Sequence, residues 1–98
     1  MAKKAAVILG SDSDLETMRP CIRRLKSFSI ETEVRVISAH RTPAAAEAFA
    51  SAARAEGFGV LIAAAGKAAH LAGVLAAYTS LPVIGVPIKT SMMGGLDS

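Results

Sequence analysis

The sequence has little cysteine and few aromatic residues. One cysteine, Cys21, and four aromatic residues occur among its 98 positions, and tryptophan is absent. A single cysteine excludes an intramolecular disulfide and indicates a reducing compartment. We interpret Cys21 as a core or interface thiol. With a net charge of only +3 and so few rings on which bases could stack, nucleic acid is not expected as a partner.

The sequence also lacks a segment that predicts a signal peptide or a membrane span. The first apolar run, residues 5–9, is shorter than the apolar region of a signal peptide. Residues 68–88 carry no formal charge, but His70, Pro82 and Pro87 divide them into shorter elements. We therefore expect a cytoplasmic protein that does not enter a membrane.

Apolar residues are abundant instead. They make up 52% of the sequence, and the mean hydropathy is +0.44. This composition excludes a disordered chain and predicts a core buried on several sides, or an oligomer. The length predicts one domain covering residues 1–98.

Short apolar runs alternate with helical patterns along the chain. We predict strands over residues 5–9, 33–37, 60–65 and 82–86, and helices from Ser13 to about Phe28, from Pro43 to Gly57 and from His70 to Tyr78. Ser13 and Glu16 have the spacing of a capping box, whereas Pro20 predicts a bend or an irregular first turn in the first helix. The alternation predicts parallel βαβ units.

Ligands of such sheets bind beyond the carboxyl ends of the strands. Four segments leave those ends, and they hold both histidines of the chain. Their polar residues are Ser11, Asp12, Ser13, Asp14, Ser38, His40, Arg41, Thr42, Lys67, His70, Lys89, Thr90 and Ser91. This clustering predicts a functional site.

The first segment, Gly-Ser-Asp-Ser-Asp at residues 10–14, is open to three interpretations. A metal site is disfavoured because calcium loops need more oxygen ligands and zinc normally takes closely spaced histidines or cysteines. A strand-to-helix turn with backbone N–H groups favours an anion, and the carboxylates add acceptors for hydroxyl groups, as in a ribose phosphate. The third interpretation is a simple helix cap, which we favour for Ser13 and which leaves Asp12 without an assignment.

The second segment contains Ser-Ala-His-Arg-Thr-Pro at residues 38–43. Arg41 suits bidentate binding of a phosphate, and His40 suits proton transfer in both directions near neutral pH. The alternative is a loop histidine bonded to the backbone beside a surface arginine. In the third segment, Gly66 permits close approach of a ligand, and His70 suits a structural role as well as a catalytic one.

Four motifs in this order and spacing, "GSDSD", "SAHRTP", "AAHLAG" and "LPVIGVP", closely resemble the class I PurE family of N5-carboxyaminoimidazole ribonucleotide mutases. The resemblance implies a flavodoxin-like three-layer α/β/α fold with a parallel sheet, four of whose strands lie here in the order 2-1-3-4. It also implies a homo-octamer and an isomerase of purine biosynthesis that moves a carboxylate from the exocyclic nitrogen of an aminoimidazole ribonucleotide to ring carbon C4. No cofactor and no metal are implied.

By position, the resemblance implies that His40 is the general acid and base and that His70 is a second histidine of the site. Ser11 and Asp14 would contact the ribose phosphate part of the substrate, and Arg41 its phosphate. Ser38 and Gly66 are also expected to line the substrate site. The sequence departs from the family at Ala64 and Lys67, where relatives usually have glycine. It is further expected to lack the C-terminal strand and helices of the family, which puts the activity of the 98-residue chain in doubt.

Three other functions remain open. A class II relative would carboxylate aminoimidazole ribonucleotide directly with CO2. A PurE-like carboxylase acting on another nucleotide would be expected to carry an added N-terminal domain. A non-catalytic fragment would only bind nucleotide or assemble.

Overall fold

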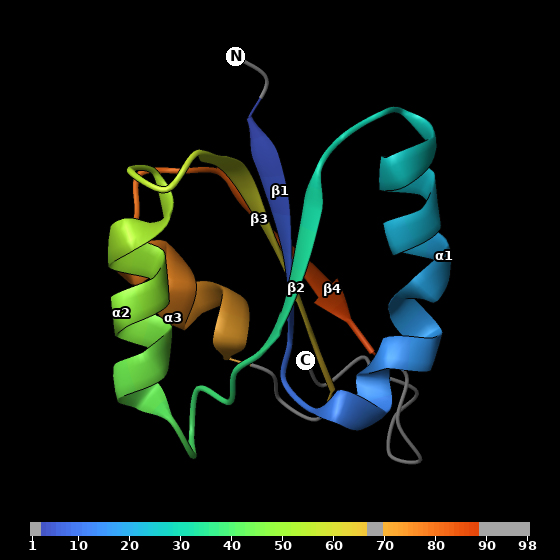
Figure 1. Cartoon of the computed structure of the whole chain (residues 1–98). Helices are drawn as coiled ribbons and strands as arrows, with labels where there is room; N and C mark the ends of the chain where they lie inside the picture. The colour runs from blue at the N-terminus through green and yellow to red at the C-terminus, as the bar shows by residue number, and fades with distance from the viewer. Residues whose placement is uncertain (1–2, 67–69, 89–98) are drawn as a thin grey trace.

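The structure is a computed structural model that describes residues 3–66 and 70–88. Its elements, in chain order, are β1 (Lys4–Leu9), η1 (Asp12–Asp14), α1 (Leu15–Ser27), β2 (Thr32–Val36), α2 (Pro43–Ala53), β3 (Phe58–Ala65), α3 (Leu71–Ala77) and β4 (Val83–Pro87). Figure 1 shows α1 on one side of the sheet and α2 and α3 on the other. The predicted three-layer α/β/α architecture is confirmed.

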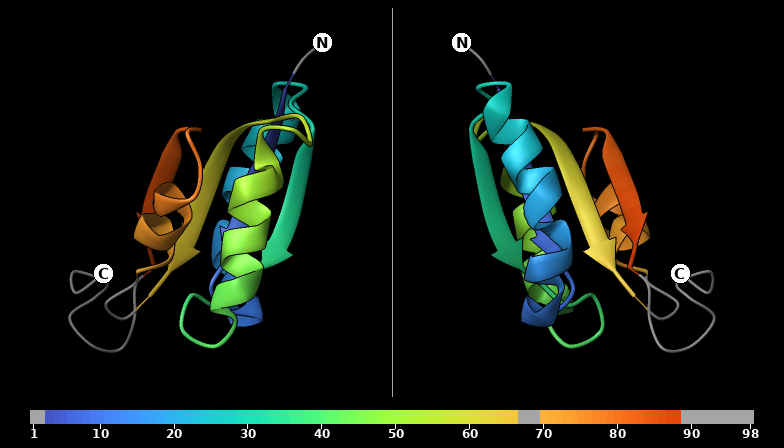
Figure 2. Two further views of the ribbon diagram at one scale, coloured as in Figure 1. Left: turned by 90° about the vertical axis from the view of Figure 1, so that its left-hand side faces the viewer. Right: turned by 90° about the vertical axis from the view of Figure 1, so that its right-hand side faces the viewer.

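All strand pairs are parallel, and the strand order is β2-β1-β3-β4. Val7 of β1 pairs with Val34 of β2 on one side and with Ile62 of β3 on the other. The predicted order 2-1-3-4 is therefore confirmed. Because the strands are parallel, their carboxyl ends all lie at one edge of the sheet, the lower edge in Figure 2.

The core has two clusters, one on each face of the sheet. Ala6 and Ile8 of β1 pack toward α2 and α3, whereas Val7 and Leu9 pack toward α1 around Met18. Residues 5–9 are at most 1% exposed. Burial on both faces explains why this strand is a continuous apolar run rather than an alternating one.

The outer strands are covered less. Val36 of β2 is 55% exposed and Ile84 of β4 is 52% exposed. Ile84 pairs with Ile62 and Val36 with Leu9, so both exposed side chains lie on the face that carries α1. In the part of the chain that the structure describes, α1 covers the middle of this face, and the side chains at its two flanks are exposed.

Several predicted boundaries shift by a few residues. The largest difference is in α2, which ends at Ala53, whereas Gly57, with a φ of +95°, lies in the turn that leads into β3. Helix α3 begins at Leu71, and His70 is the residue before it. Helix α1 continues through Pro20, and the 3-10 turn η1 directly precedes its first turn.

The prediction that Ser13 caps the first helix is wrong. A short 3-10 turn, η1, precedes α1, and Ser11 caps that turn by accepting a hydrogen bond from the Ser13 N–H. Asp14 precedes α1 and makes no side-chain capping bond, and Glu16 pairs with Arg19 at 2.6 Å instead of reaching back. The extra turn moves the capping position two residues upstream.

Among residues 3–66 and 70–88, no helix has the length and apolarity that crossing a bilayer requires.

Candidate active site

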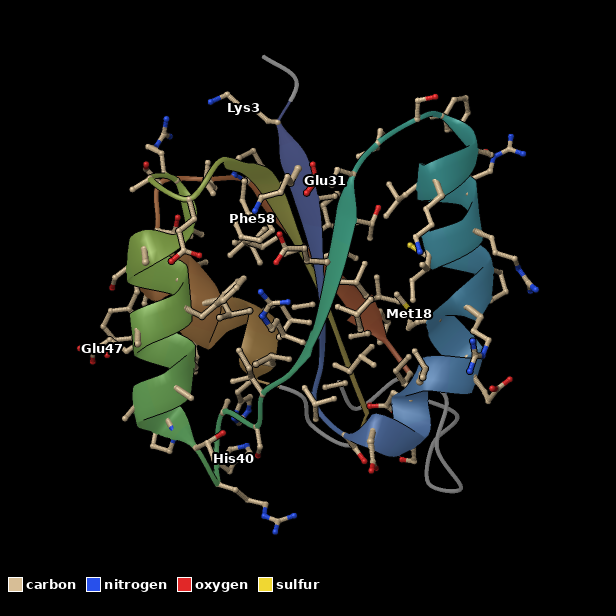
Figure 3. All side chains as sticks on the ribbon, viewed as in Figure 1. Lys3, Met18, Glu31, His40, Glu47 and Phe58 are labelled. Carbon is tan, nitrogen blue, oxygen red and sulfur yellow. The ribbon has the colours of Figure 1, made fainter. Side chains whose placement is uncertain are left out.

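The loops that follow β1, β2 and β3 surround a cavity of about 240 Å³. Its lining residues are Gly10, Ser11, Asp14, Ser38, Ala39, His40, Ala65, Gly66, His70 and Leu71. Of the seven residues that the sequence predicted for the site, all but Arg41 line this cavity. Figure 3 shows His40 at the lower end of the molecule, opposite Lys3.

Arg41 lines a second hollow of about 480 Å³. The other lining residues are Gly10, Ser11, Asp12, Val36, Ser38 and Thr42. The two hollows share Gly10, Ser11 and Ser38, so they are adjacent compartments on either side of the first loop. This division was not visible in the sequence, which placed His40 and Arg41 next to each other.

Gly10 forms the point where the two compartments meet. Its N–H donates a hydrogen bond of 2.9 Å to the Ala64 carbonyl oxygen, which holds the end of β1 against β3. A Cβ at position 10 would lie 2.9 Å from the Cβ of Ala65, closer than side chains normally approach. Sequence reasoning did not assign Gly10 to the site, although a glycine directly after a buried strand is a signal for close approach.

The first loop presents hydroxyl groups at the mouth of the site. The Ser11 and Ser13 hydroxyls lie 2.9 Å apart, and both side chains are exposed. Ser11 therefore has two functions, because it caps η1 and also lines both hollows. Asp12, left without an assignment by the sequence, lines the Arg41 hollow.

Asp14 is partly buried in the wall of the cavity. Burial raises the pKa of its carboxyl group, and a hydrogen bond with the Ser11 backbone opposes part of that rise. A carboxylate that is held in a partly apolar wall despite this cost is typical of a functional site.

The second loop is closed by hydrogen bonds between its own residues. The Thr42 hydroxyl donates to the Ser38 carbonyl oxygen at 2.9 Å and accepts from the Ser38 N–H at 3.1 Å. The Ser38 hydroxyl accepts from the Arg41 N–H at 3.1 Å. His40 and Arg41 lie inside this closed turn, and both are exposed.

The two histidines meet across the cavity. Their ring centroids are 5.4 Å apart, and the ring planes are inclined at 63°, an edge-to-face arrangement. His40 comes from the loop after β2, and His70 directly precedes α3. The predicted clustering of both histidines at one edge of the sheet is confirmed.

In the described ranges, no group of three or more His, Cys, Asp or Glu side chains could hold a metal ion. That no metal or cofactor is used remains a prediction. Ala64, one departure from the family pattern, is fully buried in β3. Lys67, the other departure, and three polar residues expected near the site, Lys89, Thr90 and Ser91, lie outside the described residues.

Comparison with known proteins gives a consistent result. Residues 4–98 match the family described as AIR carboxylase. Proteins from Pyrococcus abyssi and Saccharolobus solfataricus, both named N5-carboxyaminoimidazole ribonucleotide mutase, are 53% and 54% identical over 95 residues. These matches cover 97% of the chain but only 55% and 60% of the two relatives, so the chain spans little more than half of their length. The crystal structure of Treponema denticola PurE has a TM-score of 0.82 and 25% identity, and the match covers 95% of this chain and 60% of that one.

Proposed function

Because the chain belongs to the AIR carboxylase family, we propose that it acts as an N5-carboxyaminoimidazole ribonucleotide mutase, an isomerase of purine biosynthesis. The observation that carries the proposal is the cavity in which His40, His70, Ser11 and Asp14 converge beside a compartment lined by Arg41. A ribonucleotide has an anionic phosphate at one end and a ring at the other. The compartment lined by Arg41 suits the phosphate, and the compartment lined by the two histidines suits the ring.

Charge and size suggest which compartment each part of the substrate occupies in this proposal. The phosphate occupies the hollow lined by Arg41, whose guanidinium group forms paired hydrogen bonds with phosphate oxygens. The ribose lies against Ser11 and Ser38, which line both compartments, and the aminoimidazole ring enters the cavity lined by His40. Asp14, in the wall of that cavity, accepts hydrogen bonds from the ribose part.

His40 transfers the proton in both halves of the reaction. In the first half, the bond between the exocyclic nitrogen and the carboxylate carbon breaks, CO2 is released, and His40 gives a proton to that nitrogen. In the second half, ring carbon C4 attacks the CO2, and His40 takes the proton from C4, which restores the aromatic ring. One histidine serves both steps, because an imidazole can both give and take a proton, and it ends in its starting state.

The rest of the cavity retains the CO2 between the two steps. Ala39, Ala65 and Leu71 give the wall an apolar surface, and Gly66 leaves room for the ring to lie against the backbone. An apolar wall disfavours hydration of the intermediate. His70, edge-on to His40, limits the orientations available to the catalytic ring.

We also infer that the protein works as a homo-octamer in the cytoplasm, as the family resemblance implies. The exposed side chains of Val36 and Ile84 support an assembly, because apolar side chains on outer strands are commonly covered by a partner or by further chain. Analytical ultracentrifugation measures the assembly directly. A monomer at micromolar concentration would contradict it for the 98-residue chain.

The activity is tested with two proteins. The first is the chain itself, and the second is a chimera in which the C-terminal part of the Pyrococcus abyssi relative follows residue 98. Each is given N5-carboxyaminoimidazole ribonucleotide, and the C4-carboxylated product is measured. Product from either protein supports the proposal, and a folded but inert chimera contradicts it. Activity only with aminoimidazole ribonucleotide and free CO2 would identify a class II carboxylase instead.

A further inference from the structure

The turn formed by residues 38–42 is held by two side-chain hydroxyls. The Thr42 hydroxyl makes two hydrogen bonds with the Ser38 backbone: it donates to the carbonyl oxygen and accepts from the N–H. The Thr42 N–H donates to the same Ser38 carbonyl oxygen at 2.9 Å. Together with the bond from the Arg41 N–H to the Ser38 hydroxyl, four hydrogen bonds close this turn.

Thr42 is itself anchored at the start of α2. Its carbonyl oxygen accepts hydrogen bonds from the Ala45 and Ala46 N–H groups, at 3.1 and 3.2 Å. On the other side of the turn, the Ile37 N–H donates to the Leu9 carbonyl oxygen of β1 at 2.9 Å. The Thr42 side chain therefore connects the helix, which is fixed by the core, to the strand end that carries Ser38.

Within the described residues, the side chains of His40 and Arg41 are not held by hydrogen bonds of this kind. In residues 3–66 and 70–88, neither the His40 nor the Arg41 side chain makes a hydrogen bond or ion pair, and both are exposed. Among the described residues, the aromatic contact of His40 is with the ring of His70. The backbone of the turn therefore decides where both side chains begin, and only the His40 ring has a further contact that restricts it.

We propose that Thr42 is a positioning residue of this site, whose hydroxyl fixes the turn so that His40 faces one compartment and Arg41 the other. This inference deepens the proposed function and rests on it for its effect on turnover. Thr42 also lines the Arg41 hollow, but its hydroxyl hydrogen is donated to the Ser38 carbonyl oxygen, so we assign its effect to the Ser38 backbone and not to proton transfer. Small displacements of positioned groups cost large factors in rate, about a hundredfold for 1 Å.

Two substitutions separate the hydroxyl from the shape of the side chain. Thr42→Val keeps the branched shape but removes both side-chain hydrogen bonds, and Thr42→Ser keeps the hydroxyl. In the active protein, Thr42→Val is expected to lower kcat about 10- to 100-fold, and to raise KM because Arg41 moves as well. For Thr42→Ser, kcat and KM are expected to stay within about threefold of the original values, because the serine hydroxyl can make both hydrogen bonds with the Ser38 backbone.

Thr79→Val is the matched control. The Thr79 hydroxyl also accepts a backbone N–H, that of Leu81 at 3.2 Å, but it lies in the turn between α3 and β4. This variant loses a comparable hydrogen bond away from the cavity, so its kcat and KM should not change. An equal loss in Thr79→Val and Thr42→Val would reduce the effect to general destabilisation and overturn the proposal.

A second measurement keeps the proposal testable if no turnover is found. Amide hydrogen exchange of Ser38, Arg41 and Thr42 is followed by NMR in the 98-residue chain. These amides should exchange faster in Thr42→Val and at the original rate in Thr42→Ser. That result supports a turn held by the Thr42 hydroxyl even if the proposed activity fails. Unchanged exchange, or unchanged kcat and pH profile in an active protein, overturns it.

Discussion

His40 and His70 lie edge to face, with their ring centroids 5.4 Å apart. The contact joins the loop after β2 to the residue before α3, across the end of β1, which lies between β2 and β3 in the sheet. Both rings line the same cavity, so the proposed proton transfer by one histidine can be compared with the effect of replacing the other.

Replacing His40 by Asn is expected to abolish turnover while ribonucleotide binding stays within a few fold. A positioned acid–base group contributes about 10²–10⁴-fold to rate, whereas the proposed phosphate contact comes from Arg41 in the other compartment. Steady-state kinetics and calorimetric titration with aminoimidazole ribonucleotide measure the two effects. His70→Asn serves as the comparison and should lose less activity. A His40→Asn enzyme that retains full kcat would remove the histidine from the mechanism.

Gly10→Ala is expected to destabilise the protein by about 1–3 kcal/mol, the usual range for overpacking. The added Cβ would lie 2.9 Å from the Ala65 Cβ, so the end of β1 must move away from β3. Gly73→Ala is the control, because no atom lies within 4 Å of a Cβ at that helical position. It should be neutral or up to about 1 kcal/mol more stable. Urea unfolding compares the two, and equal midpoints would show that the contact with Ala65 is relieved without cost.

Asp14→Asn is expected to make the protein more stable at neutral pH and to weaken ribonucleotide binding. Because burial raises the pKa of Asp14, the folded state disfavours the ionised carboxylate. The resulting cost is present at pH values above the raised pKa and disappears as the pH falls toward the unfolded value of about 3.9.

Urea unfolding of both proteins across this pH range measures the effect. The advantage of the Asn variant should shrink with decreasing pH. Asp12→Asn, an exposed neighbour in the same loop, should change stability little. A less stable Asn variant at pH 7 would mean that favourable contacts, rather than a burial cost, dominate at Asp14.

Glu33→Gln is expected to reduce stability at pH 7 but not in acid. Hydrogen bonds from Lys4 and Arg35 lower the pKa of Glu33, so its ionised form stabilises the fold. That contribution is present above the unfolded pKa of about 4.3 and is lost as the pH falls through the lower folded value.

The pH dependence of the urea midpoint tests this prediction against a matched variant. Glu47→Gln removes an exposed carboxylate from α2 that has no ion pair in the described part of the chain. The two Gln variants should differ at pH 7 and converge below the lowered pKa of Glu33. A constant difference at all pH values would assign the effect to packing near Phe58, over which Lys4 lies at 4.4 Å, rather than to charge.

Sequence reasoning was strongest where a local pattern decides the structure. The run at residues 5–9 had to be buried on both faces, and Pro43 had to begin a helix. It was weakest at the start of the first helix. Ser13 and Ser11 are both followed by acidic residues, and only the 3-10 turn at residues 12–14 decides that Ser11 is the cap. A one-turn element of this kind has too few residues to leave a periodic pattern.

The sequence by itself determined the order of strands and helices, and with it the edge of the sheet at which the polar loops gather. Local hydrophobic spacing, Gly and Pro are sufficient for this, because each acts within a few residues. Only the tertiary structure decided that Gly10 lies against Ala65, that His40 meets His70, and that Arg41 faces a separate compartment. These relations depend on the register of parallel strands and on the hydrogen bonds that shape each loop. The residues involved are either far apart in the sequence or are neighbours that line different hollows, so no local pattern indicates them.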